Sequence, residues 1–145
     1  MKVASILQAK GTRLVTMRPS QTIAAVVRRL RSEGIGAIIL SEDGQRMLGM
    51  ISEREIVHSL AVHGTELLDL PASELMLRSV VTCGPDDSVR AVMAAMTRHR
   101  VRHIPVMEDG RLRGIVSIGD VVKHRLDEVE SETRVLRDAY IAGHR

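Results

Sequence analysis

Two short segments of the chain combine a glycine, a serine and an acidic residue at the same spacing. Residues 49–55 read GMISERE and residues 114–120 read GIVSIGD, so in each segment the serine precedes the acidic residue by three positions. This spacing is typical of a helix start, where the two side chains bond the first free backbone groups. The same helix end attracts anions, and a carboxylate one turn further can accept the hydroxyls of a ribose. The pattern therefore indicates either a helix cap or a sugar-phosphate site, and it occurs twice.

The two segments belong to a longer internal repeat. A shift of 66 residues aligns residues 15–45 with 81–111, and a shift of 65 then aligns residues 49–57 with 114–122. Twelve of these 40 aligned positions are identical, and most of the other pairs keep their apolar or polar character. We interpret the repeat as a duplication of one structural unit.

Each copy predicts the order strand, helix, strand, strand, helix. A short strand is expected around Val15 and again around Val81, and it is followed by a helix whose apolar residues are spaced i, i+3, i+4 and i+7 from Ile23 or Val89. Two apolar runs in each copy predict the later strands, residues 35–40 and 47–51 in the first copy and 101–106 and 112–116 in the second. The second helix of each copy is expected to begin at Ser52 or Ser117. An Asp-Gly pair suited to a hairpin turn follows each middle strand.

We expect a mixed α/β (α+β) fold in which the two copies pack sheet to sheet with pseudo-twofold symmetry. A sheet of about three strands with helices on one side is too thin to be stable alone. The predicted division is residues 1–64 for the first repeat with a leader, 65–125 for the second repeat with a connector, and 126–145 for a C-terminal helical extension. A long helix is expected from Ser117 to about residue 142. One face of it carries Leu126, Val129, Thr133, Leu136 and Tyr140.

Composition argues against several classes of function. The net charge is +3 and the isoelectric point is about 9.6, but the arginines are scattered and Tyr140 is the only aromatic residue, so nucleic acid is not the expected partner. No apolar stretch is long enough to predict a membrane span or a signal peptide, which favours a cytoplasmic protein. The single cysteine, Cys83, is either a reactive thiol or a small filler residue, and the filler is the favoured interpretation. His99 and His103 would not share a face, and no metal site is predicted.

The duplicated pattern at 49–57 and 114–122, together with residues 101–110 (VRHIPVMEDG), resembles the CBS domain family over roughly residues 5–125. The resemblance implies a Bateman module, a pair of CBS domains with two clefts between the repeats. Such clefts bind adenosine-containing ligands and perform no catalysis. AMP is the first expected ligand, with ADP, ATP, NAD or S-adenosylmethionine as alternatives. A homodimer formed through the CBS modules and the C-terminal helix is also expected.

Carried onto this sequence, the family pattern predicts one cleft around Asp120. Asp120 would bind the ribose, Ser117 the phosphate side, and Arg102 and His103 the phosphate. Adenine would lie between aliphatic walls, with backbone groups reading its edge. The residues assigned to these walls and to the base edge are Ile115 on one side and Val15, Ile35, Gly36 and Ala37 on the other.

A second cleft is predicted around Glu55, where the family pattern has Asp. The extra methylene displaces the carboxylate, so Glu55 either reaches a ribose or serves only as the capping partner of Ser52. Arg54 is the candidate for phosphate, or else a solvated residue of the first helical turn. Met50, Val101 and His103 would lie beside the base.

Three functions compete for this sequence. The favoured one is an energy-sensing regulatory module whose ligand changes the activity of an unidentified partner protein. The alternatives are a basic nucleic-acid-binding or ligand-independent protein-interaction module, and a small enzyme. The chain has no room for a separate catalytic domain and no nucleophile with a base at a plausible spacing, so no enzymatic activity is expected.

Overall fold

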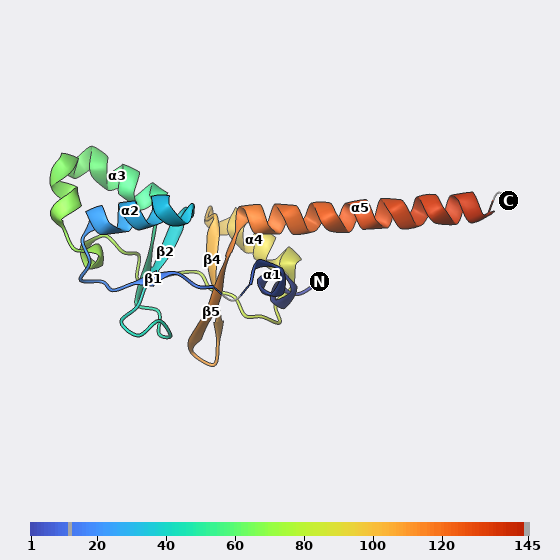
Figure 1. Cartoon of the computed structure of the whole chain (residues 1–145), viewed down its shortest axis with the longest axis horizontal. Helices are drawn as coiled ribbons and strands as arrows, with labels where there is room; N and C mark the ends of the chain where they lie inside the picture. The colour runs from blue at the N-terminus through green and yellow to red at the C-terminus, as the bar shows by residue number, and fades with distance from the viewer. Residues whose placement is uncertain (12, 144–145) are drawn as a thin grey trace.

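The first repeat folds into a three-stranded sheet with two helices. The computed structural model describes residues 1–11 and 13–143. Strands β1 (Thr16–Met17), β2 (Ala37–Leu40) and β3 (Gly49–Ser52) lie in the order β1-β2-β3, with β1 parallel and β3 antiparallel to β2. Helix α2 (Ile23–Glu33) precedes β2 and helix α3 (Glu53–His63) follows β3 (Figure 1). The buried side of α2 consists of Ile23, Val26 and Leu30, as the apolar spacing predicts.

The second repeat has the same order but a smaller sheet. Helix α4 (Val89–His99) is followed by the antiparallel strands β4 (His103–Glu108) and β5 (Arg111–Ser117) and by helix α5 (Ile118–Gly143). The strand predicted around Val81 is reduced to a single bridge between Cys83 and Val106. The next amide, that of Gly84, donates to the Asp87 carboxylate at 2.8 Å instead of to a strand, so the chain turns away from the sheet at this point.

The middle strands begin two residues later than predicted, at Ala37 and His103. The amides of Ile35 and Val101 donate to the helix carbonyls of Leu30 and Met96 at 3.0 and 3.1 Å. In both repeats a left-handed residue ends the helix, Gly34 with φ 65° and Arg100 with φ 54°. Residues 35 and 101 therefore satisfy helix ends and are not available to pair in a sheet.

The two Asp-Gly pairs form different turns. Asp109 and Gly110 both have positive φ, 52° and 74°, and join β4 directly to β5 as a two-residue hairpin. In the first repeat the Asp43 carboxylate accepts hydrogen bonds from the amides of Gln45 and Arg46 at 2.9 and 3.0 Å. These bonds close a wider loop, so the hairpin prediction is right for the second repeat only.

The leader packs on the second repeat and the connector packs on the first. The leader forms helix α1 (Val3–Lys10) and packs into the core of the second repeat, where Val3 and Ile6 are buried. The connector forms the 3-10 turns η1 (Gly64–Asp69) and η2 (Ala72–Glu74) and packs into the core of the first. Each segment also forms a hydrogen bond to the turn before the first helix of the repeat on which it packs. The Ala4 amide donates to the Pro85 carbonyl at 2.9 Å, and the Ala72 amide donates to the Gln21 carbonyl at 2.7 Å.

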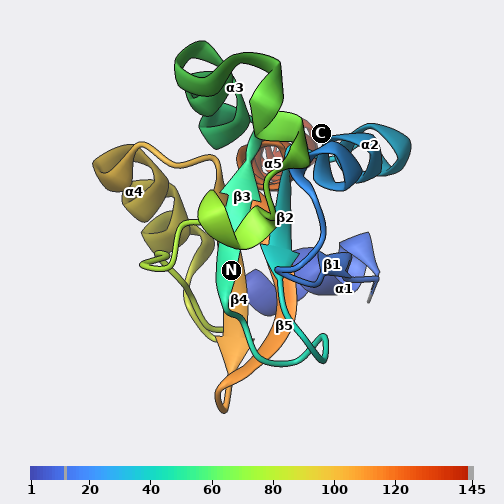
Figure 2. The same ribbon diagram turned by 90° about the vertical axis from the view of Figure 1, so that its left-hand side faces the viewer.

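A third apolar cluster lies between the two sheets. Ala37, Ile39 and Met50 of the first repeat are buried against Leu112 of the second. Figure 2, seen from the end of the molecule, shows β2 and β3 in front of β4 and β5. The sheet-to-sheet packing and the mixed α/β class predicted from the repeat are confirmed.

Helix α5 is the long helix predicted from Ser117 onward. It has 26 residues, and it projects away from both repeats for most of its length (Figure 1). Residues 131–143 are exposed throughout. In the part of the chain that the structure describes, no helix has an apolar stretch long enough to cross a membrane.

The glycine that opens each Ser-to-acid segment lies directly beneath the connector or the leader. A Cβ atom added to Gly49 would stand 2.8 Å from the backbone oxygen of Leu77 in the connector. One added to Gly114 would stand 2.7 Å from a terminal methyl of Leu7 in α1. The first obstacle is backbone and the second is the flexible end of a side chain, so the two sites tolerate a methyl group differently.

Gly49→Ala should therefore destabilise the protein by about 1–3 kcal/mol, and Gly114→Ala by under about 1 kcal/mol. Urea unfolding of the two variants and the wild type measures both free energies. Equal losses, or a larger loss for Gly114→Ala, would contradict this assignment of the close contacts.

Candidate functional site

The Ser-to-acid turn of the second repeat caps helix α5 with reciprocal bonds. The Ser117 amide donates to Oδ2 of Asp120 at 2.8 Å, and the Asp120 amide donates to the Ser117 hydroxyl at 3.1 Å. The cap interpretation is thus correct for this turn. The Ser117 amide and the Lys10 ammonium both donate to Oδ2 of Asp120, and neither of these two bonds uses the other carboxylate oxygen, Oδ1. A cap and a ligand can therefore share this carboxylate.

Lys10, at the last turn of α1, completes the surroundings of Asp120. Its ammonium donates to Oδ2 of Asp120 at 2.7 Å and to the carbonyl of Ile115 at 2.9 Å. Burial raises the pKa of Asp120, but the hydrogen bonds from Lys10 and from the Ser117 amide outweigh it, so the pKa lies below its usual value. Asp120 is therefore ionised at neutral pH and can accept hydrogen bonds.

His103, Gly36 and Glu53 meet beside this turn. His103 pairs with Ser117 across the β4–β5 ladder. A Cβ added to Gly36 would stand 3.1 Å from Cε1 of His103 and 3.2 Å from Oε1 of Glu53, so the absence of a side chain at Gly36 leaves room for both groups. The start of α3, from the first repeat, is thereby brought against β4 of the second.

The imidazole of His103 is neutral near neutral pH. Burial, the largest cause, lowers its pKa, and the cations of Lys10 and Arg102 lower it further, whereas the carboxylates of Glu53 and Asp120 raise it. The net shift is downward. Of the two basic residues assigned to phosphate, Arg102 carries the charge, and its side chain is exposed.

The structure gathers only part of the residues assigned to the first cleft. Ala37 and Ile115 both belong to the apolar cluster between the sheets, and Gly36, His103, Ser117 and Asp120 adjoin it. Val15 and Ile35 pack instead against the core of the first repeat.

The residues assigned to the second cleft are engaged within the protein. Both carboxylate oxygens of Glu55 bond Ser52, its amide at 3.3 Å and its hydroxyl at 2.5 Å. The Arg54 guanidinium donates to the carbonyl of Arg100 at 3.4 Å. Met50 exchanges both backbone hydrogen bonds with Leu77 of the connector, and Val101 packs on the core of the second repeat.

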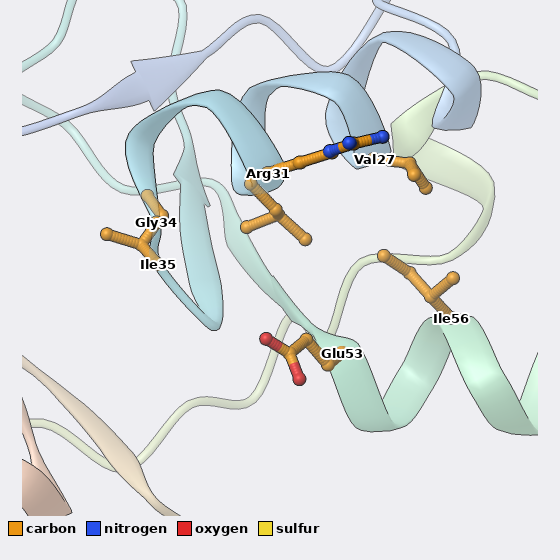
Figure 3. A pocket seen from close by; sticks show the side chains of 7 residues that line it. Val27, Arg31, Gly34, Ile35, Glu53 and Ile56 are labelled. Atoms are coloured by element: carbon orange, nitrogen blue, oxygen red, sulfur yellow. The ribbon is translucent and has the colours of Figure 1, made fainter.

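An apolar hollow of about 380 Å³ adjoins the site at Glu53. Val27 of α2 and Ile56 of α3 line its two sides, and Glu53 and Ile35 also line it (Figure 3). All of its lining residues belong to the first repeat.

Reasoning from the sequence missed Lys10 and Glu53. Lys10 lies outside the repeat, and only the packing of α1 on the second repeat brings it to Asp120. Glu53 lies in the Ser-to-acid segment, but its counterpart in the second copy is Ile118. The repeat therefore did not indicate that Glu53 belongs to the site. One available signal was the rarity of lysine, since Lys2, Lys10 and Lys123 are the only lysines in the chain.

Other reactive groups lack the surroundings that chemistry would need. Burial, followed by the neighbouring Asp87 carboxylate, raises the pKa of Cys83 to about 11, so its thiol is protonated. Among the described residues, no three His, Cys, Asp or Glu side chains form a group that could hold a metal ion.

The ion pair predicts a pH response that Lys10 controls. Because the folded pKa of Asp120 lies below its unfolded value, the pair stabilises the protein at neutral pH, and this contribution is lost as the pH falls through the folded pKa. Lys10→Met should raise the pKa of Asp120, as followed by NMR titration of its carboxyl carbon. Lys2→Met is the matched control, because Lys2 contacts the exposed Asp86 at 3.6 Å. An Asp120 pKa that Lys10→Met leaves unchanged would refute the pairing.

Comparison with known proteins places these features in a family. The family model "CBS domain" matches residues 8–62 and 72–127. The mitochondrial CBS domain-containing protein CBSX3 of Arabidopsis thaliana is 32% identical over 126 residues, which are 84% of this chain and 61% of that relative. The chain thus spans less than two thirds of this plant relative.

Solved structures show the same fold. The CBS-domain containing protein ATU1752 from Agrobacterium tumefaciens has a TM-score of 0.83 and 38% identity, over 86% of this chain and 99% of that one. The CBS domain pair of protein MJ0100, solved in complex with 5′-methylthioadenosine and S-adenosyl-L-methionine, has a TM-score of 0.77 and 22% identity, over 88% and 98%. With two matched segments that together cover more than half of its residues, the chain belongs to the CBS domain family and carries a tandem pair of these domains.

Proposed function

We propose that this CBS pair is a regulatory module that binds one adenosine-containing ligand between its repeats, with the ribose on Asp120. The proposal is carried by the ionised, half-buried Asp120 carboxylate, which lies beside the inter-repeat cluster and whose bonds from Lys10 and the Ser117 amide both use Oδ2, not Oδ1. Ribose hydroxyls are donors of the kind that such an oxygen accepts. The complex of the MJ0100 pair with two adenosyl compounds supports this ligand class.

The adenine would lie against aliphatic groups in this cleft. Ala37 and Ile115 come from different repeats and share one apolar cluster, and Gly36 adds backbone without a side chain. Val15 and Ile35, which pack on the first repeat's core, would form its outer wall. Because the chain has no Phe or Trp, the purine would be held by dispersion contacts and backbone hydrogen bonds.

The charges near the cleft favour ligands of two kinds. Arg102 offers a guanidinium for a phosphate, which favours AMP and, after it, ADP, ATP or NAD. Glu53, close to Gly36 and His103, favours a cationic ligand such as S-adenosylmethionine. AMP remains the first proposed ligand, and a comparison of AMP with S-adenosylmethionine distinguishes the two kinds.

The second cleft is proposed to be weak. A ligand there would have to displace Glu55 from Ser52 and Arg54 from Arg100 before either side chain could bind it. The Met50 backbone is already paired with the connector. The sugar-binding capacity of the module would therefore reside mainly in the second repeat's turn.

The position of Asp120 offers a route from ligand to partner. The Ser117–Asp120 turn is the first turn of α5, the helix that extends away from the repeats. A ligand gripped there by both repeats would bias their relative angle and the direction of α5 together, without any reaction. We propose that a partner protein reads this change and that the module is cytoplasmic.

Titration calorimetry with AMP on two matched variants tests the assignment. Asp120→Ala and Glu55→Ala each remove the acidic residue of a helix cap, and Asp120→Ala also removes the partner of the Lys10 ammonium. Asp120→Ala should weaken binding by about tenfold or more, which corresponds to about 1.4 kcal/mol, and Glu55→Ala by less than about threefold. Equal losses would contradict the ranking of the clefts, and no binding of AMP or S-adenosylmethionine to the wild type would refute the function.

A further inference from the structure

Apolar side chains on the outer part of helix α5, among them Val135, Leu136 and Ile141, are exposed. The CBS family match ends at residue 127, and residues 131–143 are exposed throughout. Leu126 is 57% exposed and Leu136 71%. A lone helix of this length is only marginally stable in water, so its stability calls for a second surface that covers these side chains.

The apolar residues of α5 follow a heptad pattern. From Val122, steps of four and three lead alternately to residues 126, 129, 133, 136, 140 and 143, which keeps the a and d positions of about three heptads on one seam. Leu126, Thr133 and Tyr140 fall at a, and Val122, Val129 and Leu136 at d. A strict alternation of this kind matches another helix with the same repeat.

We propose that this seam binds the seam of a second copy of the chain, parallel and in register, as a two-stranded coiled coil. The flanking charges support this partner and this direction. In a parallel pair, a g residue meets the e residue five positions later on the other helix. Glu132 then faces Arg137, and Arg125 faces Glu130, so opposite charges meet in both layers.

The antiparallel arrangement that sets Leu126 against Leu136 is disfavoured by the same charges. There, e positions meet e positions and g positions meet g positions, so Glu130 faces Glu130 and Glu132 faces Glu132. Like charges at these positions oppose pairing. The polar Thr133 at a would meet its own counterpart in the parallel register, and polar residues at this position help to fix the register.

The proposed coil would place both CBS pairs at one end. The two Ser117–Asp120 turns, at the first turn of each α5, would then lie at the same end of the coil. A partner protein would meet the paired helices as one unit. The coil does not depend on nucleotide binding, so its test can fail or succeed independently of the proposed function.

Disulfide trapping in the full chain tests the register. With Cys83→Ser as background, Leu136→Cys places one thiol at a d position, where parallel helices bring identical residues within disulfide reach. Val135→Cys is the matched control, since Val135 is 64% exposed but lies at c, on the outer side of the coil. Under mild oxidation, dimers should form about tenfold faster or more for Leu136→Cys. Equal rates, or no dimer from either variant, would overturn the proposal.

A charge exchange tests the direction through the flanking charges. In the Leu136→Cys background, Glu132→Arg and Arg137→Glu should each cross-link several-fold more slowly when alone, because each sets like charges against each other. Their equimolar mixture should recover the original rate and give mainly mixed dimers. A mixture no faster than the separate variants would overturn the parallel pairing.

Discussion

The apolar layer between the two small sheets is the constraint on which the rest of the molecule depends. Ala37, Ile39 and Met50 on one sheet and Leu112 on the other form a core that neither repeat could complete alone. By joining the sheets, this layer brings Gly36 and Glu53 of one repeat against His103 of the other. These residues of the candidate site come together only because the repeats pack in this way.

The leader packs on the second repeat and the connector on the first, which reinforces that layer. The two segments differ, so the two repeats are not equivalent around it. Each segment lies on the glycine that opens a Ser-to-acid turn, the backbone of Leu77 over Gly49 and the side chain of Leu7 over Gly114. The leader, however, ends in Lys10, which bonds Asp120, whereas the connector pairs with the backbone of Met50. Two turns that share a glycine, a serine and an acidic residue at the same spacing therefore differ in their bonding partners, and the ligand site is proposed at only one of them.

The repeat and its apolar spacing were sufficient to predict the mixed α/β class, the order of elements, the sheet-to-sheet packing and the long final helix. Local hydrogen bonds shifted the details. The amides of Ile35 and Val101 bond helix ends, so the middle strands begin two residues later than predicted. The Asp87 carboxylate bonds the Gly84 amide, so the strand expected near Val81 is reduced to one bridge. These bonds depend on side-chain and backbone geometry that apolar spacing does not encode.

The candidate site was only partly predictable for a different reason. The Ser-to-acid spacing identified Ser117 and Asp120, because a cap is a local motif. Lys10 is 110 residues away from Asp120 in the sequence, and no pattern within the repeat links them. Contacts of this kind follow from the packing of α1 on the second repeat. No pattern in the sequence predicted that this leader would pack there.

Crystal structures of the protein with AMP and with S-adenosylmethionine would test most directly whether an adenosine ligand binds between the repeats at Asp120. An adenosine moiety should lie between Ala37 and Ile115, with its ribose hydroxyls within hydrogen-bond distance of Asp120. A ligand bound elsewhere, for example in the hollow between α2 and α3, or an empty cleft at saturating concentrations of both compounds, would contradict it.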